Sequence, residues 1–596
     1  MGAFFACNPL NREVIASRTI LRARAVFETA KGMTVAGEAG LTTKVVKFAR
    51  TRSGSSVLAV SSRGWLVSIG NWHHPDIAER DDTSSLLEYL EAQGISALDD
   101  LDGGYVIAWY DEPTDTLTVV PDHLGRLHAY FVVSDSGVFV SSSAMALAAV
   151  VPCEPDPVAV YELLATGTIW EDRSPFTNIR RLQDTTRYFF RNGRLDSTDR
   201  ITGLMVPRPG RMPGQSSLDD VIAAYHSSLT RSLGGYQRIV VDLTGGYDTR
   251  LLVGFLHRFG YQFDATVSGK PTHRDVSCAQ KLSDSIGIKL VREPPEVVTP
   301  EKSSFPRVLS AAARVDGKHD AIEYVGIEHV QHTHAERYDA GVNGAGGEMW
   351  RSFWWDSRHL KPKSNSPIPR VLPRFAGLAI DPLFLDREWT LNPFDHFTGV
   401  LTRSLKGRIG YPPHDQLDHF YVGVRMQNWQ GTITTATNEI WPNLTLHLDR
   451  RPLEMIFDIE PSERLSCRLV NEMFRRFGKP FANVPLERGL PPQNLTLLNA
   501  WRFALAARGK PAYFWDVWRQ RQVRKVGVDK QSADIVRALF RSGAADYLQP
   551  HSMALMPLFD KNRLDSFLDV AERTGEVPLT LVGRLIALEF AFRSAA

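Results

Sequence analysis

The chain reads IVVDLTGGYDTRL from Ile239 to Leu251, and this stretch decides its fold. The β-branched run predicts a short buried strand, and the two glycines allow a tight turn into a following helix. Backbone N–H groups in such a turn, together with the positive end of the helix dipole, attract an anion such as phosphate. The stretch therefore predicts a phosphate-binding loop; the alternative is an ordinary strand–turn–helix connection capped by Asp248 or Thr249.

The hydroxyl and acidic residues of this loop suit a nucleotide phosphate. Thr244 and Thr249 can donate hydroxyl hydrogen bonds to phosphate oxygens. Asp248 would repel a phosphate at direct contact, so its expected role is to hold a Mg²⁺ ion that bridges to the phosphate.

Helices alternate with strands on both sides of the loop. Helices are predicted over 218–233, 249–259 and 276–286, and strands over 238–243 and 263–267. Strand alternating with helix is typical of a doubly wound parallel sheet. From about Leu417 onward helical patterns dominate, so we expect an α/β nucleotide-binding domain with a helical carboxyl-terminal part.

The residues before position 200 show a different pattern. Short β-branched or aromatic runs predict strands over 56–60, 65–69, 105–110, 116–120, 130–133 and 138–141, with helices over 84–92 and 157–166. This mixture predicts an antiparallel α+β domain. The stretch Pro207–Gly214 is rich in proline and glycine and predicts a linker, so the expected domains are residues 1–208 and 215–596.

Composition sets the class of protein. With 596 residues the chain has room for roughly two to four domains. Its net charge of +2 gives no sign of nucleic-acid binding. The four cysteines are far apart, which excludes a cysteine-rich zinc site and fits a reducing compartment. Neither a secretory signal nor a membrane span is evident, so we expect a cytoplasmic protein without membrane or nucleic-acid partners.

Thr244-Gly-Gly-Tyr-Asp-Thr249 resembles the Ser-Gly-Gly-x-Asp-Ser pyrophosphate loop of the asparagine synthetase family. Asn343-Gly-Ala-Gly-Gly-Glu348 is similar to that family's second signature, Ser-Gly-Glu-Gly-Ala-Asp. Residues 102–111 and 121–130 resemble a strand and a turn of the family's glutaminase domain. The resemblance implies an Ntn-hydrolase-like α+β sandwich without its N-terminal nucleophile over 1–208. It implies an asparagine-synthetase-like ATP-binding domain of the PP-loop type over 215–596.

The resemblance also implies an ATP-dependent reaction that requires Mg²⁺. Members of the family activate a carboxylate with ATP as an acyl-adenylate, release pyrophosphate and let an amine attack. The implied nucleotide-binding residues are Leu243, Thr244, Gly245, Gly246, Asp248, Thr249, Val267, Gly269, Gly344 and Gly346. The implied Mg²⁺ ligands are Asp248 and Glu348.

The sequence departs from the family at the glutaminase nucleophile. The family uses a cysteine directly after the initiator methionine, whereas this chain has Gly2. Cys7 would serve only after removal of the residues before it, and its Ala-Cys-Asn-Pro context differs from the family's Cys-Gly-Ile. We therefore expect Cys7 to be a small buried thiol and the amine to come from a source other than glutamine.

Further departures concern the catalytic residues. Ala345 stands where asparagine synthetases have Glu and β-lactam synthetases have a tyrosine that works in amine deprotonation. Glu439 is the candidate general base. The equal alternative is that Glu439 is only an acid on a helix surface, without a catalytic role. Arg488 lies nearest to the place of the family's late lysine, which stabilises charge on the transferring phosphate; Lys479 and Lys510 are rivals.

These features predict an AMP-forming carbon–nitrogen ligase. Relatives without the N-terminal cysteine include lasso-peptide cyclases and β-lactam synthetases. By analogy, the favoured role is a macrocyclase or peptide-amide ligase in natural-product biosynthesis. The alternatives are an ammonia-dependent asparagine synthetase-like amidotransferase and a catalytically idle scaffold. The expected partners are a carboxylate substrate, of which a peptide is one form, and an amine acceptor. Association with partner biosynthetic proteins and formation of a homodimer are further possibilities.

Overall fold

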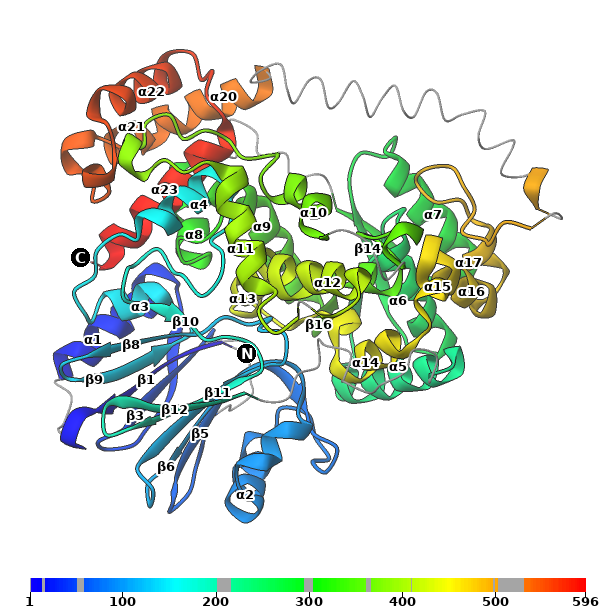
Figure 1. Cartoon of the computed structure of the whole chain (residues 1–596), viewed down its shortest axis with the longest axis horizontal. Helices are drawn as coiled ribbons and strands as arrows, with labels where there is room; N and C mark the ends of the chain where they lie inside the picture. Colours follow the sequence, from blue (N-terminus) through cyan, green and yellow to red (C-terminus); the bar gives the residue numbers. More distant parts are fainter. Residues whose placement is uncertain are drawn as a thin grey trace.

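The computed structural model describes residues 2–12, 17–50, 58–200, 216–293, 304–360, 366–408, 410–496, 499–501 and 530–595. Within them the chain forms a β-rich amino-terminal part and a larger α/β and helical part (Figure 1). The predicted linker at Pro207–Gly214 and the rival cation Lys510 lie outside the described residues. The domain boundaries at 208 and 215 therefore stay predictions.

Two six-stranded antiparallel sheets form the amino-terminal part. The first has the order β10 (Arg180–Arg181), β8 (Tyr130–Ser134), β9 (Gly137–Ser141), β1 (Ala3–Pro9), β3 (Lys44–Ala49) and β2 (Thr34–Ala39). The second has the order β12 (Arg194–Arg200), β11 (Thr186–Arg191), β7 (Thr116–Pro121), β6 (Asp102–Asp111), β5 (Gly64–His73) and β4 (Leu58–Val60). Apolar side chains from both sheets, such as Phe4, Val67 and Val106, form one core between them.

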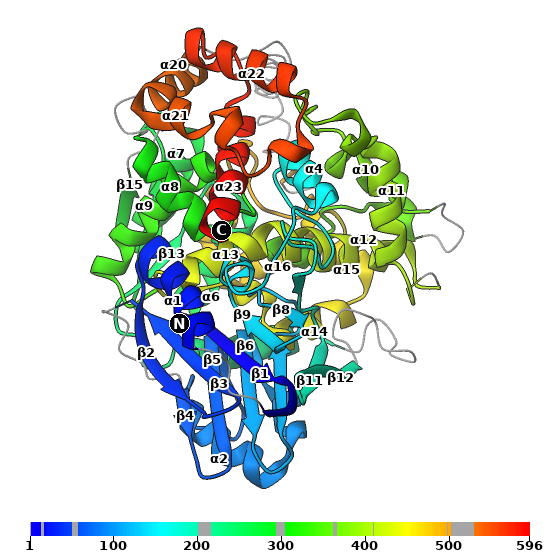
Figure 2. The ribbon, with the colours of Figure 1, turned by 90° about the vertical axis from the view of Figure 1, so that its left-hand side faces the viewer.

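Helices cover the outer faces of both sheets. Helix α2 (Thr83–Gln93) begins at Asp82, whose side chain caps it, and buries Leu86 and Leu90 against the second sheet. Helices α1 (Ser17–Ala25) and α3 (Ala144–Ala148) share a core with the first sheet. The result is a four-layer α/β/β/α sandwich, seen below the helical part in Figure 2, which confirms the predicted α+β sandwich.

A five-stranded parallel sheet organises the larger part. Its order is β15 (Leu290–Glu293), β14 (Asp264–Ser268), β13 (Ile239–Asp242), β16 (Ala340–Val342) and β17 (Asn443–Leu444). Helix α5 (Leu218–Leu233) precedes β13, and the helices between the strands include α6 (Tyr247–Arg258), α7 (Arg274–Ile286) and α9 (Ala321–Arg337). The winding direction reverses between β13 and β16. In open α/β sheets, ligands bind at the carboxyl ends of the strands at such a point.

Helices fill the rest of the larger part, and from about Leu417 onward this agrees with the sequence prediction. They include α8 (Phe305–Arg314), α10 (Ile368–Phe375), α11 (Pro393–Ser404), α12 (Pro413–His419), α13 (Gly431–Asn438), α14 (Arg450–Asp458), α15 (Pro461–Arg464), α16 (Arg468–Phe477), α17 (Lys479–Asn483), α20 (Lys530–Leu539), α21 (Ala545–Tyr547), α22 (Lys561–Arg573) and α23 (Leu579–Ala595). Helix α23 packs between α8 and α9 on one side and α3 and α4 (Pro157–Thr166) on the other. No helix among the described residues is both long and apolar enough to cross a membrane.

Buried polar contacts join the two parts of the chain. Arg126, in the turn after β7, lies 3.1 Å from Asp449 and donates to the Thr445 carbonyl oxygen at 3.3 Å. Asp102, at the start of β6, accepts a hydrogen bond from the Arg450 N–H at 2.7 Å. Because buried charges are costly unless they are paired, these contacts hold the sandwich against the segment that follows β17.

Candidate functional site

The Thr244–Thr249 loop lies between the end of β13 and the start of α6. The Thr249 hydroxyl accepts a hydrogen bond from the Thr244 N–H at 2.9 Å, and the two hydroxyl oxygens lie 3.1 Å apart. Gly246 occupies the N-cap position of α6, where no described side chain caps the helix. The first N–H groups of α6 are therefore available to a ligand at this loop.

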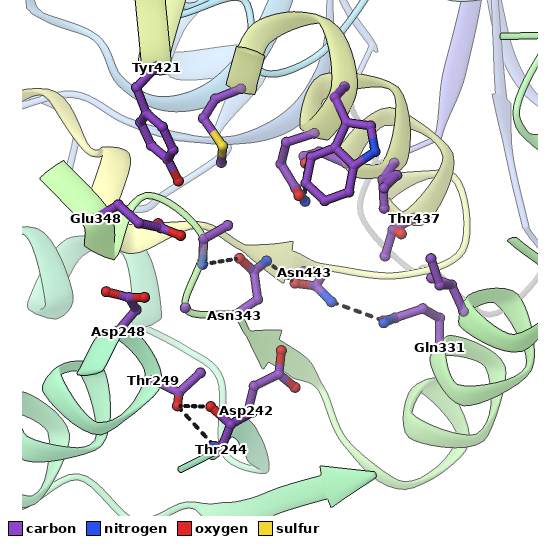
Figure 3. Close-up of a pocket in the computed structure, with 18 residues that line it drawn as sticks. Asp242, Thr244, Asp248, Thr249, Gln331, Asn343, Glu348, Tyr421, Thr437 and Asn443 are labelled. Carbon is purple, nitrogen blue, oxygen red and sulfur yellow. Dashed lines mark hydrogen bonds between the residues drawn. The ribbon is translucent and has the colours of Figure 1, made fainter. Parts of the chain in front are cut away.

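A second glycine-rich loop, residues 343–348 after β16, packs directly on the first. A Cβ on Gly344 would lie 2.7 Å from Thr249 Cγ2, and one on Gly347 would lie 2.4 Å from Asp248 Cβ. Ordinary contacts begin at 3.4 Å, so only glycine lets the two loops touch at these positions. This close approach brings Glu348 opposite Asp248 (Figure 3).

A cavity of about 390 Å³ opens at the carboxyl ends of β13 and β16. The predicted residues that line it are Thr244, Asp248, Thr249, Gly344 and Glu348. The other lining residues are Asp242, Ile327, Gln331, Asn343, Ala345, Tyr421, Met426, Trp429, Gln430, Ile433, Thr434, Thr437 and Asn443. The cavity thus has an acidic and hydroxyl-rich side at the two loops and a side with uncharged polar groups, where Gln331 and Thr437 lie (Figure 3).

Asp248 and Glu348 are held in different ways. Arg351 binds both oxygens of Asp248, with Nε donating to Oδ1 at 3.1 Å and Nη2 donating to Oδ2 at 2.8 Å. Glu348 lies beside the Tyr421 side chain (Figure 3). Burial raises the pKa of the Glu348 carboxyl, and the nearby charge of Asp248 raises it further. A second negative charge at Glu348 is therefore unfavourable without a cation.

This carboxylate pair fits a Mg²⁺ ion that is shared with phosphates. The described part of the chain contains no group of three or more His, Cys, Asp or Glu side chains that could hold a metal by itself. Mg²⁺ in nucleotide sites needs only one or two carboxylates, because phosphates and water complete its shell. A cation between Asp248 and Glu348 would relieve the repulsion that raises the pKa of Glu348.

Asp242 is a site residue that the sequence interpretation missed. It ends β13, lines the cavity and points into it (Figure 3). Burial raises the pKa of its carboxyl to about 6, and it has no hydrogen bond or ion pair with the described residues. A free carboxylate with a pKa near the working pH suits a general base.

Much of the cavity wall comes from a π-helix that the sequence did not predict. The π-helix η7 (Phe420–Gln430) contributes Tyr421, Met426, Trp429 and Gln430, and α13 continues the wall. π-Helical turns occur frequently at functional sites. The sequence feature that could have indicated this wall is the run QNWQGTITTATN, residues 427–438. It is rich in uncharged polar residues although most of its residues are buried.

The remaining predicted nucleotide-binding residues do not line the cavity. Leu243 and Val267 are buried in the core beneath it. Gly245 donates its N–H to Asp275 Oδ1 at 2.9 Å. Gly269 follows β14, and Gly346 lies in the second loop with a φ of 86°. A nucleotide contact by these residues and by Gly246 stays a prediction.

The structure corrects the catalytic assignment of Glu439. Its carboxylate lies 2.9 Å from Lys31 Nζ and 3.1 Å from an Arg314 guanidinium nitrogen, and the side chains of all three residues are buried. Glu439 does not line the cavity. Because both its oxygens are bound by cations at the contact between the two parts of the chain, Glu439 is a structural residue and is unsuited to accept a proton from a substrate.

The two predicted cations lie outside the cavity lining. Arg488 is exposed, and it follows Glu487, whose N–H donates to the Gly245 carbonyl oxygen at 3.0 Å. Lys479 is exposed at the start of α17. The segment that carries Arg488 therefore contacts the phosphate loop. No contact between Lys479 and that loop is seen among the described residues. The catalytic role of either cation stays a prediction.

Neither Gly2 nor Cys7 has the surroundings of a nucleophile. Gly2 has a φ of 102°, and a Cβ there would lie 2.2 Å from the Phe48 carbonyl oxygen. Cys7 lies within β1, between β3 and β9, with 1% of its surface exposed. Burial raises the pKa of its thiol to about 11. The expectation that Cys7 is a buried thiol is confirmed.

Residues 73–199 match the family model for a glutamine amidotransferase domain. This stretch of the amino-terminal part is therefore similar to a glutamine amidotransferase domain, and the match leaves the larger part of the chain uncovered. Among curated protein sequences, none matches this chain.

Two solved structures are similar to the chain. One is the glutamine phosphoribosylpyrophosphate amidotransferase from B. subtilis complexed with ADP and GMP, at 12% identity over 44% of this chain, with a TM-score of 0.23. The chain covers 65% of the length of that structure. The other is the allosteric regulatory enzyme of purine biosynthesis, at 12% identity over 52% of this chain and 78% of that one, also with a TM-score of 0.23. Similarity at this level carries no argument about the function of this chain.

Proposed function

We propose that the chain is an ATP-dependent amide-bond synthetase that forms AMP and pyrophosphate. A carboxylate would attack the α-phosphorus of ATP and release pyrophosphate, and an amine would then attack the acyl-adenylate to give an amide and AMP. The observation that carries the proposal is the contact between the two glycine-rich loops. It places the two threonine hydroxyls, the free start of α6 and two carboxylates around one cavity.

Each group around the cavity has a role in this scheme. Thr244, Thr249 and the first N–H groups of α6 would bind phosphate oxygens. Asp248 and Glu348 would hold Mg²⁺, and Arg351 keeps Asp248 oriented through its two hydrogen bonds. Asp242 would accept the proton that the amine loses when it attacks. The chemistry rests mainly on orientation and charge stabilisation.

We infer that the amine does not come from glutamine hydrolysed at positions 2 or 7. The amino-terminal sandwich would then serve structurally, because Lys31 and Arg126 bind the synthetase part through Glu439 and Asp449. The amine would be a substrate group that enters the uncharged side of the cavity. A peptide macrocyclase or peptide-amide ligase fits this scheme, because both the carboxylate and the amine can belong to large substrates.

The test is pyrophosphate and AMP formation from ATP and Mg²⁺ with pooled carboxylates and amines, compared between wild type and Asp248→Asn. We expect substrate-dependent release in the wild type and its loss in the variant. Asp395→Asn is the matched control, because Asp395 lies on the exposed side of α11 and touches neither loop. Absence of ATP binding by the wild type would refute the proposal. Release that survives in Asp248→Asn would remove the Mg²⁺ role of this loop.

A further inference from the structure

Three arginines contact aromatic side chains beside one edge of the cavity, although none of the three is among the residues that line it. Arg425 lies on the π-helix η7, with its guanidinium carbon 4.9 Å from the ring centre of Trp429, which lines the cavity. Arg374, in the last turn of α10, lies 5.5 Å from the Phe353 ring and 5.4 Å from the Trp354 ring. Both rings contact the cavity residue Tyr421 edge to face, at 5.9 and 5.2 Å. The third, Arg351, stacks on Phe353 at 4.8 Å and pairs with Asp248.

Two of these arginines lack an acidic partner. Within the described part of the chain, neither Arg374 nor Arg425 forms an ion pair, whereas Arg351 is neutralised by Asp248 and Arg370 lies 3.8 Å from Asp356. Burial lowers the pKa of Arg374, and the positive charges of Arg370 and Arg425 lower it further. Arginines that have no acidic partner keep their hydrogen-bond donors and positive charge for an anionic ligand. Two such arginines near a cavity therefore suit the binding of a carboxylate.

We propose that Arg374 and Arg425 form a second anion-binding subsite at the Tyr421–Trp429 edge of the cavity, which binds a further carboxylate of the substrate. This inference rests on the proposed function and adds that the substrate carries at least one acidic group besides the carboxylate that is activated. A peptide with a free carboxyl terminus or an acidic side chain has this chemistry. The aromatic rings beneath the guanidiniums hold them in place and cover the apolar part of such a segment.

The nucleotide phosphates are the other anion that these arginines could bind. The phosphate loop, however, lies across the cavity from Tyr421, where Thr244 and Thr249 are found (Figure 3). Glu348 lies between Tyr421 and Asp248 (Figure 3). A ligand that spans the cavity would thus meet the two threonine hydroxyls at one side, the Asp248–Glu348 pair in the middle and the Tyr421 edge beside the arginines at the other side.

The test uses direct binding, which does not depend on catalysis. The probe is a fluorescein-labelled peptide, Gly-Asp-Gly-Glu-Gly, compared by fluorescence anisotropy with its Gly-Asn-Gly-Gln-Gly amide in wild type, Arg374→Gln, Arg425→Gln and Arg573→Gln. Arg573 is the control because it is an exposed arginine on α22, far from the cavity along the chain. ATP affinity is measured in parallel with a fluorescent ATP analogue.

We expect the wild type to prefer the acidic peptide and each subsite variant to weaken its binding at least about tenfold, with ATP affinity unchanged. Arg425→Lys should bind the acidic peptide better than Arg425→Gln, because it keeps the positive charge. This comparison distinguishes loss of charge from misfolding. Equal binding of both peptides, or unchanged binding in both glutamine variants, would overturn the inference. Loss of ATP affinity with unchanged peptide binding would assign the arginines to the nucleotide instead. A wild type that binds the peptide but not ATP would refute the proposed function and leave the subsite standing.

Discussion

Substitution of Gly347 by alanine tests the contact between the two loops. The added Cβ would lie 2.4 Å from Asp248 Cβ and 2.9 Å from Asp248 Cα, so a flexible side-chain end cannot simply move aside. An ordinary contact requires at least 3.4 Å, so the loops must separate by about 1 Å. This displacement would move Asp248 relative to Glu348 and so distort the proposed Mg²⁺ site.

A misplacement of about 1 Å in an active site can cost about 100-fold in rate. We therefore expect Gly347→Ala to lower kcat/KM for pyrophosphate release about 100-fold, which corresponds to about 2.7 kcal/mol of transition-state stabilisation. The fold should survive, because the strain is confined to two loops at the end of the sheet. Thermal unfolding followed by circular dichroism checks this point.

The matched control is Gly410→Ala. A Cβ at Gly410 would meet no atom within 4 Å, and the residue has no left-handed φ. The control should keep wild-type activity. The reasoning is refuted if Gly347→Ala turns over at the wild-type rate, or if Gly410→Ala is equally impaired while both proteins remain folded.

Further predictions concern the buried charges and the thiol. Glu439→Gln should destabilise the protein by about 3 kcal/mol, because two buried cations lose their closest counter-charge. Lys31 then keeps only a longer contact with Asp316, at 3.7 Å, and Arg314 one with Glu328, at 3.6 Å. Asp569→Asn, in an exposed ion pair, should cost less than about 1 kcal/mol, and urea titration compares the two variants. The rate of amide formation should fall as the pH drops through about 6, because Asp242 must be deprotonated to accept the amine proton. Asp242→Asn should be slow and should lack this pH dependence. A variant with the same pH profile as the wild type would exclude the assignment of Asp242 as the base. Cys7 should resist iodoacetamide at pH 8 in the native protein and react in urea; rapid native labelling of Cys7, located by mass spectrometry, would contradict its burial.

The sequence was sufficient for the elements whose signals are local. The β-branched run, the two glycines and the polar residues of 239–251 lie next to one another, so β13, the loop and the start of α6 could be predicted together. Strand β1 was missed because both its faces are buried, which removes the alternation of apolar and polar residues. Its residues Ala3–Pro9 became interpretable only once β3 and β9 were seen on either side.

Long-range contacts account for what the sequence did not reveal. In the sequence, Glu439 cannot be told from an acid on a helix surface. Only the fold brings Lys31 and Arg314 to its carboxylate. The cavity wall from η7 follows no 3.6-residue periodicity, because a π-helix has more residues per turn. Asp242 was read as part of a strand, since its free carboxylate depends on the cavity that opens above β13.

Isotope transfer tests the central claim most directly. The protein would be incubated with ATP, Mg²⁺, an amine and a substrate whose carboxylate carries ¹⁸O, and the products would be analysed by mass spectrometry. The account predicts AMP that contains one ¹⁸O atom, because a carboxylate oxygen forms the bond to the α-phosphorus and stays with AMP when the amide forms. Label in inorganic phosphate, with ADP as the nucleotide product, would contradict adenylation and indicate an acyl-phosphate.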